Sequence, residues 1–325
     1  MRVPRARAPS LRRSAAVVYD APRSLSHPST ETDRAMAIWL IPTVVSLVLY
    51  GLGQGLVKKY IAEVPPARFC LYFVAAKAVL NLSCFALFRK AELFTASAAG
   101  FDRICILAYV LDGLGWLLYF QAIVHGPIAI VGTLSAAYPA LTILFARMFL
   151  HEQLTLLQYA GVALVIGGCL GLSYAPSAPG SRTPDPRWIP LSFVAVLLWG
   201  CSSTLLKAAY RLPGADEVNV LVFSTLGGMA TLGVYGLARG RQGAASPREW
   251  TRSFVPMGML AGGDIGFIVA TRYGPVSLTT PLSGAYPVIT VIFARLVLGE
   301  RIGLLQGACI AAILGGMALT PGAGG

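Results

Sequence analysis

The chain has 325 residues, of which 56% are hydrophobic and only 12% are charged, and it carries a formal net charge of +12. A soluble domain needs more charge than this to cover its surface, and the mean hydropathy of +0.68 excludes such a domain as the bulk of the chain. The basic residues gather in the first 35 residues and in short loops, without interleaved aromatic residues. This pattern favours an anionic membrane surface and argues against nucleic-acid binding.

Residues 1–35 are rich in arginine, serine and proline and lack the apolar core of a secretory signal peptide. We expect a disordered tail. Two alternatives stay open: synthesis that begins at Met36, immediately before the first apolar segment, or an organelle transit peptide, because the segment is rich in arginine and poor in acidic residues. The seven arginines of the tail favour a cytoplasmic N-terminus, since basic flanks of membrane helices stay in the cytoplasm.

Ten apolar segments follow the tail, each close to the ~20 residues that a helix needs to cross a hydrocarbon core roughly 30 Å thick. The sequence therefore predicts an all-α, polytopic membrane protein with ten transmembrane helices. Residues 175–187, rich in Pro, Ser and Gly, are interpreted as a linker between two five-helix units, 36–174 and 188–321. The predicted helix limits are 37–57, 67–88, 104–124, 127–149, 154–174, 188–209, 217–238, 253–273, 275–298 and 302–320.

The end of the first unit is repeated at the end of the second. Residues 126–172 return as residues 274–320 without a gap, and the shared landmarks include Gly-Pro, Phe-Ala-Arg, a glutamate, Leu-Leu-Gln and Gly-Gly. Because five is an odd number of spans, the second unit must cross the membrane in the opposite sense to the first. Such inverted repeats are the scaffold of many secondary transporters, with the substrate site between the repeats near the bilayer midplane.

Each unit ends with the same succession of motifs: Gly-Pro, a Ser-x-x-Tyr-Pro helix, a Phe-Leu-x-Glu or Leu-Gly-Glu-Arg turn, then Leu-Leu-Gln and a Gly-Gly helix. These motifs span residues 126–168 and 274–316. On them, residues 36–320 resemble the paired EamA domain of the drug/metabolite transporter superfamily. The resemblance implies ten helices, a central cavity and movement of metabolites such as amino acids. One departure is His151, where the second unit has Gly299.

A polar stripe marks the fourth and ninth predicted helices. Its residues fall at i, i+3, i+4 and i+7, on one helix face, which is expected to turn toward protein or a cavity rather than toward acyl chains. Each proline frees the carbonyl four residues earlier, which must then find water, a side chain or a ligand. We expect kinked, cavity-lining helices that contact substrate; a packing kink satisfied by neighbouring side chains is the alternative. The stripes are Ser135, Tyr138, Pro139 and Thr142, and Ser283, Tyr286, Pro287 and Thr290.

Three charged residues fall deep inside predicted helices: Lys77, Asp112 and Asp264. Each costs ~2.5–3.5 kcal/mol to insert, so each needs a partner or a water-filled cavity. Lys77 and Asp112 lie near mid-span in successive antiparallel helices. They form either a structural ion pair or a site in which Lys77 receives an anionic substrate group while an aspartate relays a proton. Asp264 has no comparably placed basic residue, which favours a proton or cation role.

Aromatic and polar residues beside these charges complete the expected substrate-binding set. Trp116 shares a helix face with Asp112, and Trp199 and Ser203 share a face of the sixth predicted helix. An aromatic residue beside a polar stripe is about as often a packing residue as a cavity wall. Lys207, near the end of the same helix, is expected to extend to the lipid headgroups. The first predicted helix adds two candidate cavity residues, Tyr50 and Gln54.

Other residues are expected to serve the fold. Glycines spaced four apart in the first, fifth and eighth predicted helices favour close helix packing, and such pairs also mediate homodimers. Arg147 and Glu152 lie at a span end, and we interpret them as interfacial anchors and loop contacts. The six cysteines and three histidines are too scattered to predict a metal site, and no cofactor motif occurs in the sequence.

We expect a secondary transporter that moves amino acids or related polar solutes by alternating access. Export is the expected direction, a proton the candidate coupling ion and the bacterial inner membrane the expected location. A lipid-linked sugar flippase, or another lipid-handling protein, is the alternative and predicts a cavity that opens laterally to lipid. An intramembrane aspartyl protease is the enzymatic alternative, but the surroundings of Asp112 and Asp264 do not fit the Tyr-Asp and Gly-x-Gly-Asp signatures of that class.

Overall fold

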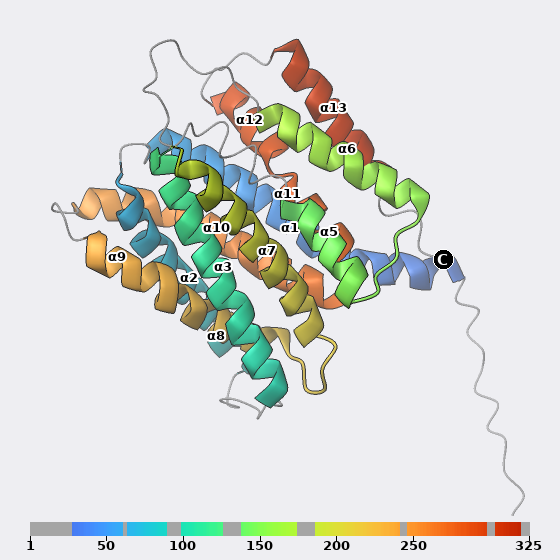
Figure 1. Ribbon diagram of the computed structural model, residues 1–325, viewed down its shortest axis with the longest axis horizontal. Helices are drawn as coiled ribbons and strands as arrows, with labels where there is room; N and C mark the ends of the chain where they lie inside the picture. Colours follow the sequence, from blue (N-terminus) through green and yellow to red (C-terminus); the bar gives the residue numbers. More distant parts are fainter. Residues whose placement is uncertain are drawn as a thin grey trace, which may run out of the picture.

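The computed structural model describes residues 28–60, 64–89, 99–125, 138–173, 186–240, 246–297 and 303–319. All regular secondary structure in these ranges is helical (Figure 1). The elements are α1 (Pro28–Tyr60), α2 (Pro66–Arg89), α3 (Ala99–His125), α5 (Tyr138–Phe149), α6 (Leu156–Ser173), α7 (Trp188–Ala209), α8 (Glu217–Gly228), the π-helix η1 (Met229–Gly233), α9 (Val234–Arg239), α10 (Pro247–Tyr273), α11 (Val276–Gly284), α12 (Pro287–Val297) and α13 (Leu304–Leu319).

Seven helical stretches among the described residues are long and apolar enough to cross a membrane. Three shorter apolar helices, α5, α6 and α13, accompany them. The all-helical class and the presence of several membrane-crossing helices are thereby confirmed, whereas the number ten stays a prediction. Agreement is closest for α7, whose limits coincide with the predicted 188–209.

Two helices begin earlier than predicted. α1 starts at Pro28, inside the segment that we expected to be a disordered tail, and residues 1–27 lie outside the described ranges. α10 starts at Pro247 rather than at residue 253, because Ser246 caps it: the Ser246 hydroxyl accepts from the Glu249 N–H at 3.1 Å. The charged first turns of α10 carry no apolar signal, which hid them from the sequence analysis.

The ninth predicted helix is broken rather than kinked. α11 ends at Gly284 and α12 begins at Pro287, whose ring nitrogen has no hydrogen to donate to the Ser283 carbonyl. The Tyr286 N–H donates to that carbonyl instead, at 3.4 Å, in the turn between the two helices. Tyr138 opens α5 at the equivalent position of the first unit, and residues 126–137 before it are not among those described.

The helices pair in a regular way around the centre of the molecule. α3 packs along α7 and α1 packs along α10, while α2 packs against both α10 and α8. α6 and α13 lie side by side at one edge (Figure 1), and they turn large apolar side chains outward. Leu156 and Leu304 are 87% and 94% exposed, a surface that suits lipid and not water.

Glycines bring α1 and α10 close together. A Cβ at Gly266 would lie 2.8 Å from the Pro42 carbonyl oxygen, and one at Gly263 would lie 2.6 Å from the Tyr50 ring. Only glycine fits at such a separation of backbones, so the close packing predicted for this helix is confirmed. The contact also places Tyr50 of α1 beside Asp264 of α10, which matters for the site.

A central acidic cavity

A cavity of about 100 Å³ lies among α1, α3, α5, α7, α10 and the turn between α11 and α12. A cavity of this size can hold several water molecules. Seven of the predicted site residues line it: Asp112, Trp116, Tyr138, Trp199, Ser203, Asp264 and Tyr286.

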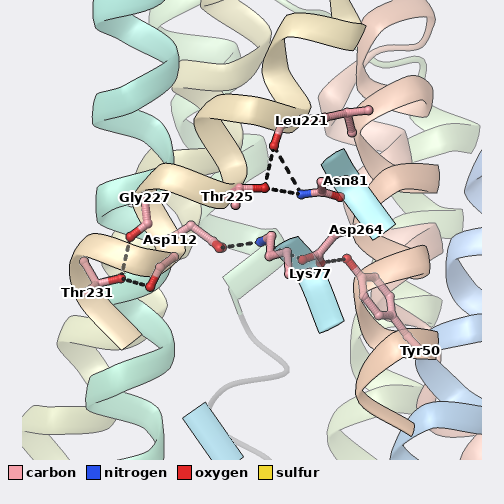
Figure 2. A network of polar contacts seen from close by, with 10 residues as sticks. Tyr50, Lys77, Asn81, Asp112, Leu221, Thr225, Gly227, Thr231 and Asp264 are labelled. Carbon is pink, nitrogen blue, oxygen red and sulfur yellow. Dashed lines mark hydrogen bonds and ion pairs between the residues drawn. The ribbon is translucent and has the colours of Figure 1, made fainter. Parts of the chain in front are cut away.

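Three charges meet beside this cavity (Figure 2). The Lys77 Nζ lies 2.8 Å from Oδ2 of Asp264 and 4.0 Å from Oδ2 of Asp112. Tyr50 donates its hydroxyl to Oδ1 of Asp264 at 2.6 Å. The expectation that Asp264 lacks a basic partner is therefore wrong, because α2 packs against α10 and brings Lys77 to Asp264 more closely than to Asp112.

Lys77 lies behind the two carboxylates and is not among the residues that line the cavity. Its side chain is almost fully buried, and its ammonium group lies 5.5 Å from the ring centroids of Phe73 and Tyr109. A buried lysine without a carboxylate would be strongly destabilising, so the pairing with Asp264 is what allows a charge at this depth. The ammonium faces the aspartates, and the aspartates face the cavity.

Hydrogen bonds and one close contact fix the helices that carry this cluster. Asn81, one turn after Lys77 on α2, donates to the Leu221 carbonyl at 3.3 Å and to the Thr225 hydroxyl at 3.2 Å on α8 (Figure 2). On α3, a side chain at Gly113 would clash with the Thr231 hydroxyl of η1. The π-helical turn therefore packs directly beside Asp112, as is frequent for such turns at functional sites.

Aromatic side chains line the same cavity as the carboxylates and form what we call the aromatic wall. The Trp199 ring centroid lies 5.1 Å from that of Trp116, 5.4 Å from that of Tyr119 and 5.8 Å from that of Tyr138. Gly115 permits this packing, because a Cβ there would lie 2.8 Å from the Trp199 indole. The indole Nε1 of Trp199 is buried against Gly115 and has no hydrogen-bond partner among the described residues.

Four predicted site residues behave differently. Ser283 is buried, but its hydroxyl donates to the Thr280 carbonyl of its own helix at 3.1 Å and does not line the cavity. Ser135 lies outside the described residues. Pro139 is buried near Gly284, and Pro287 begins α12. Pro287 therefore sets the break between α11 and α12. Tyr138 and Tyr286, each directly before a proline, are the residues of this motif that line the cavity.

Glu152, in the turn between α5 and α6, joins the first unit to the start of α11. Its carboxylate accepts from the Val276 N–H at 3.2 Å, from the Ser277 N–H at 3.0 Å and from the Ser277 hydroxyl at 2.7 Å. Arg211 lies 3.9 Å from the same carboxylate. This is a helix N-terminus capped by a residue far away in sequence, where free N–H groups and the helix dipole favour a negative charge.

Lys207 does not extend to the headgroups as expected. Its Nζ donates to the carbonyls of Thr271 and Gly274, at 2.9 and 2.6 Å, where α10 ends. Together with Glu152 it ties α7, α10 and α11 at one end of the molecule, which we call the Glu152 end.

Sequence reasoning missed six further lining residues. Three follow helical steps from predicted ones and could have been found: Tyr109 lies three residues before Asp112, Phe267 three after Asp264 and Leu260 four before it. The other three are Ser202, Leu206 and Gly284. Among the described residues, no three His, Cys, Asp or Glu side chains are grouped as metal ligands would be.

The comparisons with known proteins agree with this arrangement. Residues 36–174 and 186–321 each match the model of the EamA-like transporter family. An uncharacterised protein of Methanocaldococcus jannaschii is 30% identical over 126 residues, which cover 39% of this chain and 89% of that protein. A solved crystal structure with 20% sequence identity superposes with a TM-score of 0.71, over 88% of this chain and 98% of the other, and thereby shows the same fold. On the two family matches, the chain belongs to the EamA-like transporter family, a family of integral membrane transporters.

Proposed function

We propose that this protein is a secondary transporter that carries a small polar metabolite through the central cavity by alternating access. The observation that carries the proposal is the pair of aspartates, Asp112 and Asp264, exposed to a cavity in the middle of a membrane-embedded helical bundle. Carboxylates at this depth are costly and mark solute or ion pathways in membrane proteins. Amino acids or related solutes are the proposed substrates, export the proposed direction and a proton the proposed coupling ion.

We further propose that the two units are inverted repeats and that ten helices cross the membrane. Equivalent contacts support this. Gly51 of α1 packs against Ile289 of α12, and Gly200 of α7 packs against Leu141 of α5. Ile289 and Leu141 occupy matching positions of the repeated segments, so each first helix meets the fourth helix of the other unit through the same contact. A pseudo-symmetric pairing of this kind gives a carrier two related conformations.

The Glu152 end is the proposed gate of one conformation. Glu152, Arg211 and Lys207 hold α11 against α7 and α10 there, so opening that end requires the Glu152 carboxylate to leave the Val276 and Ser277 amides. These bonds are few and lie at helix ends, which suits a contact that breaks in every transport cycle. The gate lies on the side of the N-terminus of α1, which we propose to be cytoplasmic.

Transport by the purified protein in sealed liposomes tests the proposal. A panel of amino acids, nucleosides and polyamines is presented with and without a proton gradient, and Asp112→Asn is compared with Asp102→Asn, which removes a carboxylate from the first turn of the same helix. We expect uptake of at least one solute that depends on Asp112 and not on Asp102. A flat response across the whole panel would contradict the proposal and would favour the lipid-handling alternative.

A further inference from the structure

The polar centre holds more negative than positive charge. Among the described residues around the cavity, Asp112 and Asp264 are the carboxylates and Lys77 is the one ammonium group near them. With all three ionised, the centre carries one uncompensated negative charge in a region where a bare charge is costly. The cluster is therefore incomplete by one positive charge, which a ligand or a proton must supply.

Asp112 is the carboxylate that lacks compensation. Asp264 has close partners on both oxygens: Lys77 at 2.8 Å and the Tyr50 hydroxyl at 2.6 Å. The nearest cation to Asp112 is the same Lys77, at 4.0 Å, beyond hydrogen-bonding distance. The Asp112 side chain is also the more exposed of the two, at 24% against 14%. Asp112, which lines the cavity, is therefore the carboxylate with which an entering cation would pair.

No other described group around Asp112 supplies the missing charge. α7 contributes Trp199, Leu206 and two serines to the cavity, and its Lys207 is bound to backbone carbonyls at the Glu152 end. The remaining ionisable neighbours are phenols, which are neutral at physiological pH. They come from α1, α3, α5 and the turn between α11 and α12: Tyr50, Tyr109, Tyr119, Tyr138 and Tyr286.

The aromatic wall, which lines the same cavity as the carboxylates, suits a cation with an apolar surface. Trp116, Trp199 and Tyr138 present rings to the same cavity as Asp112. The faces of such rings carry partial negative charge and attract ammonium groups, most strongly where water is excluded. A hydrated metal ion gains little from apolar ring faces, whereas an alkylammonium gains from both the rings and the carboxylate. The volume of about 100 Å³ suits a small ligand.

We infer that the cavity binds a small organic monocation, an ammonium carrying a few alkyl carbons, against Asp112, and that this cation and a proton occupy the site in turn. The inference deepens the proposed transport function and rests on it for the exchange across the membrane. When the cation leaves, a proton neutralises the Asp112 carboxylate; when the cation binds, that proton is released to the solution. One charge moves each way, so the exchange is electrically neutral.

Binding to the purified full-length protein in detergent micelles tests the ligand class. Three probes share one branched shape and differ in charge: tetramethylammonium, neutral tert-butanol and anionic pivalate. Sodium ion is the fourth probe. We expect tetramethylammonium to quench the tryptophan fluorescence of the cavity and to release up to one proton per cation bound, as followed with a pH dye in weakly buffered solution. The other three probes should bind at least about tenfold more weakly.

The pH dependence and two variants sharpen the test. A proton competes with the cation for the same carboxylate. Once the pH is low enough to protonate Asp112, each further unit by which the pH is lowered should reduce the affinity for tetramethylammonium by about tenfold. Asp112→Asn should abolish both cation binding and proton release, whereas Asp102→Asn should change neither. Equal binding of tert-butanol or pivalate, tighter binding of sodium, or no binding by any probe would overturn the inference. So would cation binding without proton release at a pH low enough to protonate Asp112.

These outcomes separate the ligand class from the transport function. If tetramethylammonium binds with proton release but liposomes carry no solute, the ligand class stands and the proposed transport is wrong. If liposomes carry a neutral or anionic solute through Asp112 and tetramethylammonium does not bind, the carrier stands and the inferred ligand class is wrong.

Discussion

Among the described residues, Lys77 is buried and Lys207 is half-buried, and their ammonium groups are satisfied in different ways. Lys77, in the middle of α2, is 3% exposed and pairs with the Asp264 carboxylate at 2.8 Å. Lys207, in the last turn of α7, donates to the carbonyls of Thr271 and Gly274. The three helices that carry this cluster, α2, α3 and α10, pass the point without a helix end, so the charge of Lys77 requires an opposite charge. At the end of α10 the free carbonyls and the negative end of the helix dipole suffice.

The comparison distinguishes a structural contact at the Glu152 end from a charge at the centre that a ligand can balance. At the Glu152 end, the lysine and the carboxylate are each satisfied by backbone groups, and nothing in the contact requires a solute. At the centre, the second aspartate carries a charge that no group among the described residues balances. A carrier of the proposed kind uses both kinds of site. One is a contact that holds a helix end and breaks during transport, and the other is a binding site whose charge the solute balances.

Replacing each lysine by methionine should give the largest effects and should separate the two regions. Lys77→Met leaves two buried carboxylates without a cation and is expected to lower the free energy of unfolding by ~3–5 kcal/mol. Lys207→Met leaves two carbonyls short of a donor and should cost ~1–3 kcal/mol. Denaturant unfolding of the purified protein in detergent measures both. Equal losses would show that the two sites are not different in kind.

Asp112→Asn should impair transport without harming the fold. Losing an interaction between a solute and a charged partner costs ~1.5–3 kcal/mol, which corresponds to a loss of about ten- to a hundredfold in transport at low solute concentration. The unfolding free energy should be unchanged or slightly higher, because Lys77 lies 4.0 Å from this carboxylate and compensates it incompletely. Liposome uptake and unfolding are measured on the same preparation. A loss of stability that matches the loss of transport would assign Asp112 a structural role instead.

Glu152→Gln should loosen the Glu152 end by about 1–2 kcal/mol, because neutral hydrogen bonds replace charge-assisted ones at the start of α11. We expect faster hydrogen exchange at the Val276 and Ser277 amides. The exchange of the Leu221 amide, in the part of α8 that Asn81 contacts, should not change. Unchanged exchange at both amides would mean that the Glu152 carboxylate does not hold α11.

Ser283→Ala should have the smallest effect, although the sequence marks Ser283 as a substrate-binding residue. Its hydroxyl donates within its own helix, to the Thr280 carbonyl at 3.1 Å. We expect transport equal to that of the unaltered protein and a change in unfolding free energy within about 1 kcal/mol. A transport defect with normal stability would return Ser283 to the site. Ser203→Ala, on the cavity lining, is the matched comparison.

Much of the fold could be predicted because its signals are local. The length of the apolar segment predicted the limits of α7. The mid-span positions of Lys77 and Asp112 in successive helices predicted that the two side chains lie near one another. The pairing of Lys77 with Asp264 could not be predicted in this way. It depends on α2 packing against α10, two helices from different units, and no periodicity within either helix encodes that contact.

The stripes of the fourth and ninth predicted helices show a second limit. Helical spacing places Ser283 and Tyr286 on one face only if the helix is continuous. The structure breaks the helix between them, so Tyr286 lines the cavity while Ser283 bonds to its own helix. Proline signalled the break, but the direction of each side chain after it depends on tertiary packing. Glu152 was likewise interpreted as an anchor because its partners lie more than a hundred residues away.

Labelling of a single cysteine in the cavity tests alternating access most directly. Ser203→Cys is placed in a background in which the six native cysteines are alanine, and a membrane-impermeant thiol reagent is applied to sealed vesicles from one side and then from the other. The proposed mechanism predicts reaction from both sides, with Glu152→Gln raising the rate from the Glu152 end. Reaction from one side only in both proteins, or from neither side, would contradict a cavity that opens in turn to the two faces of the membrane.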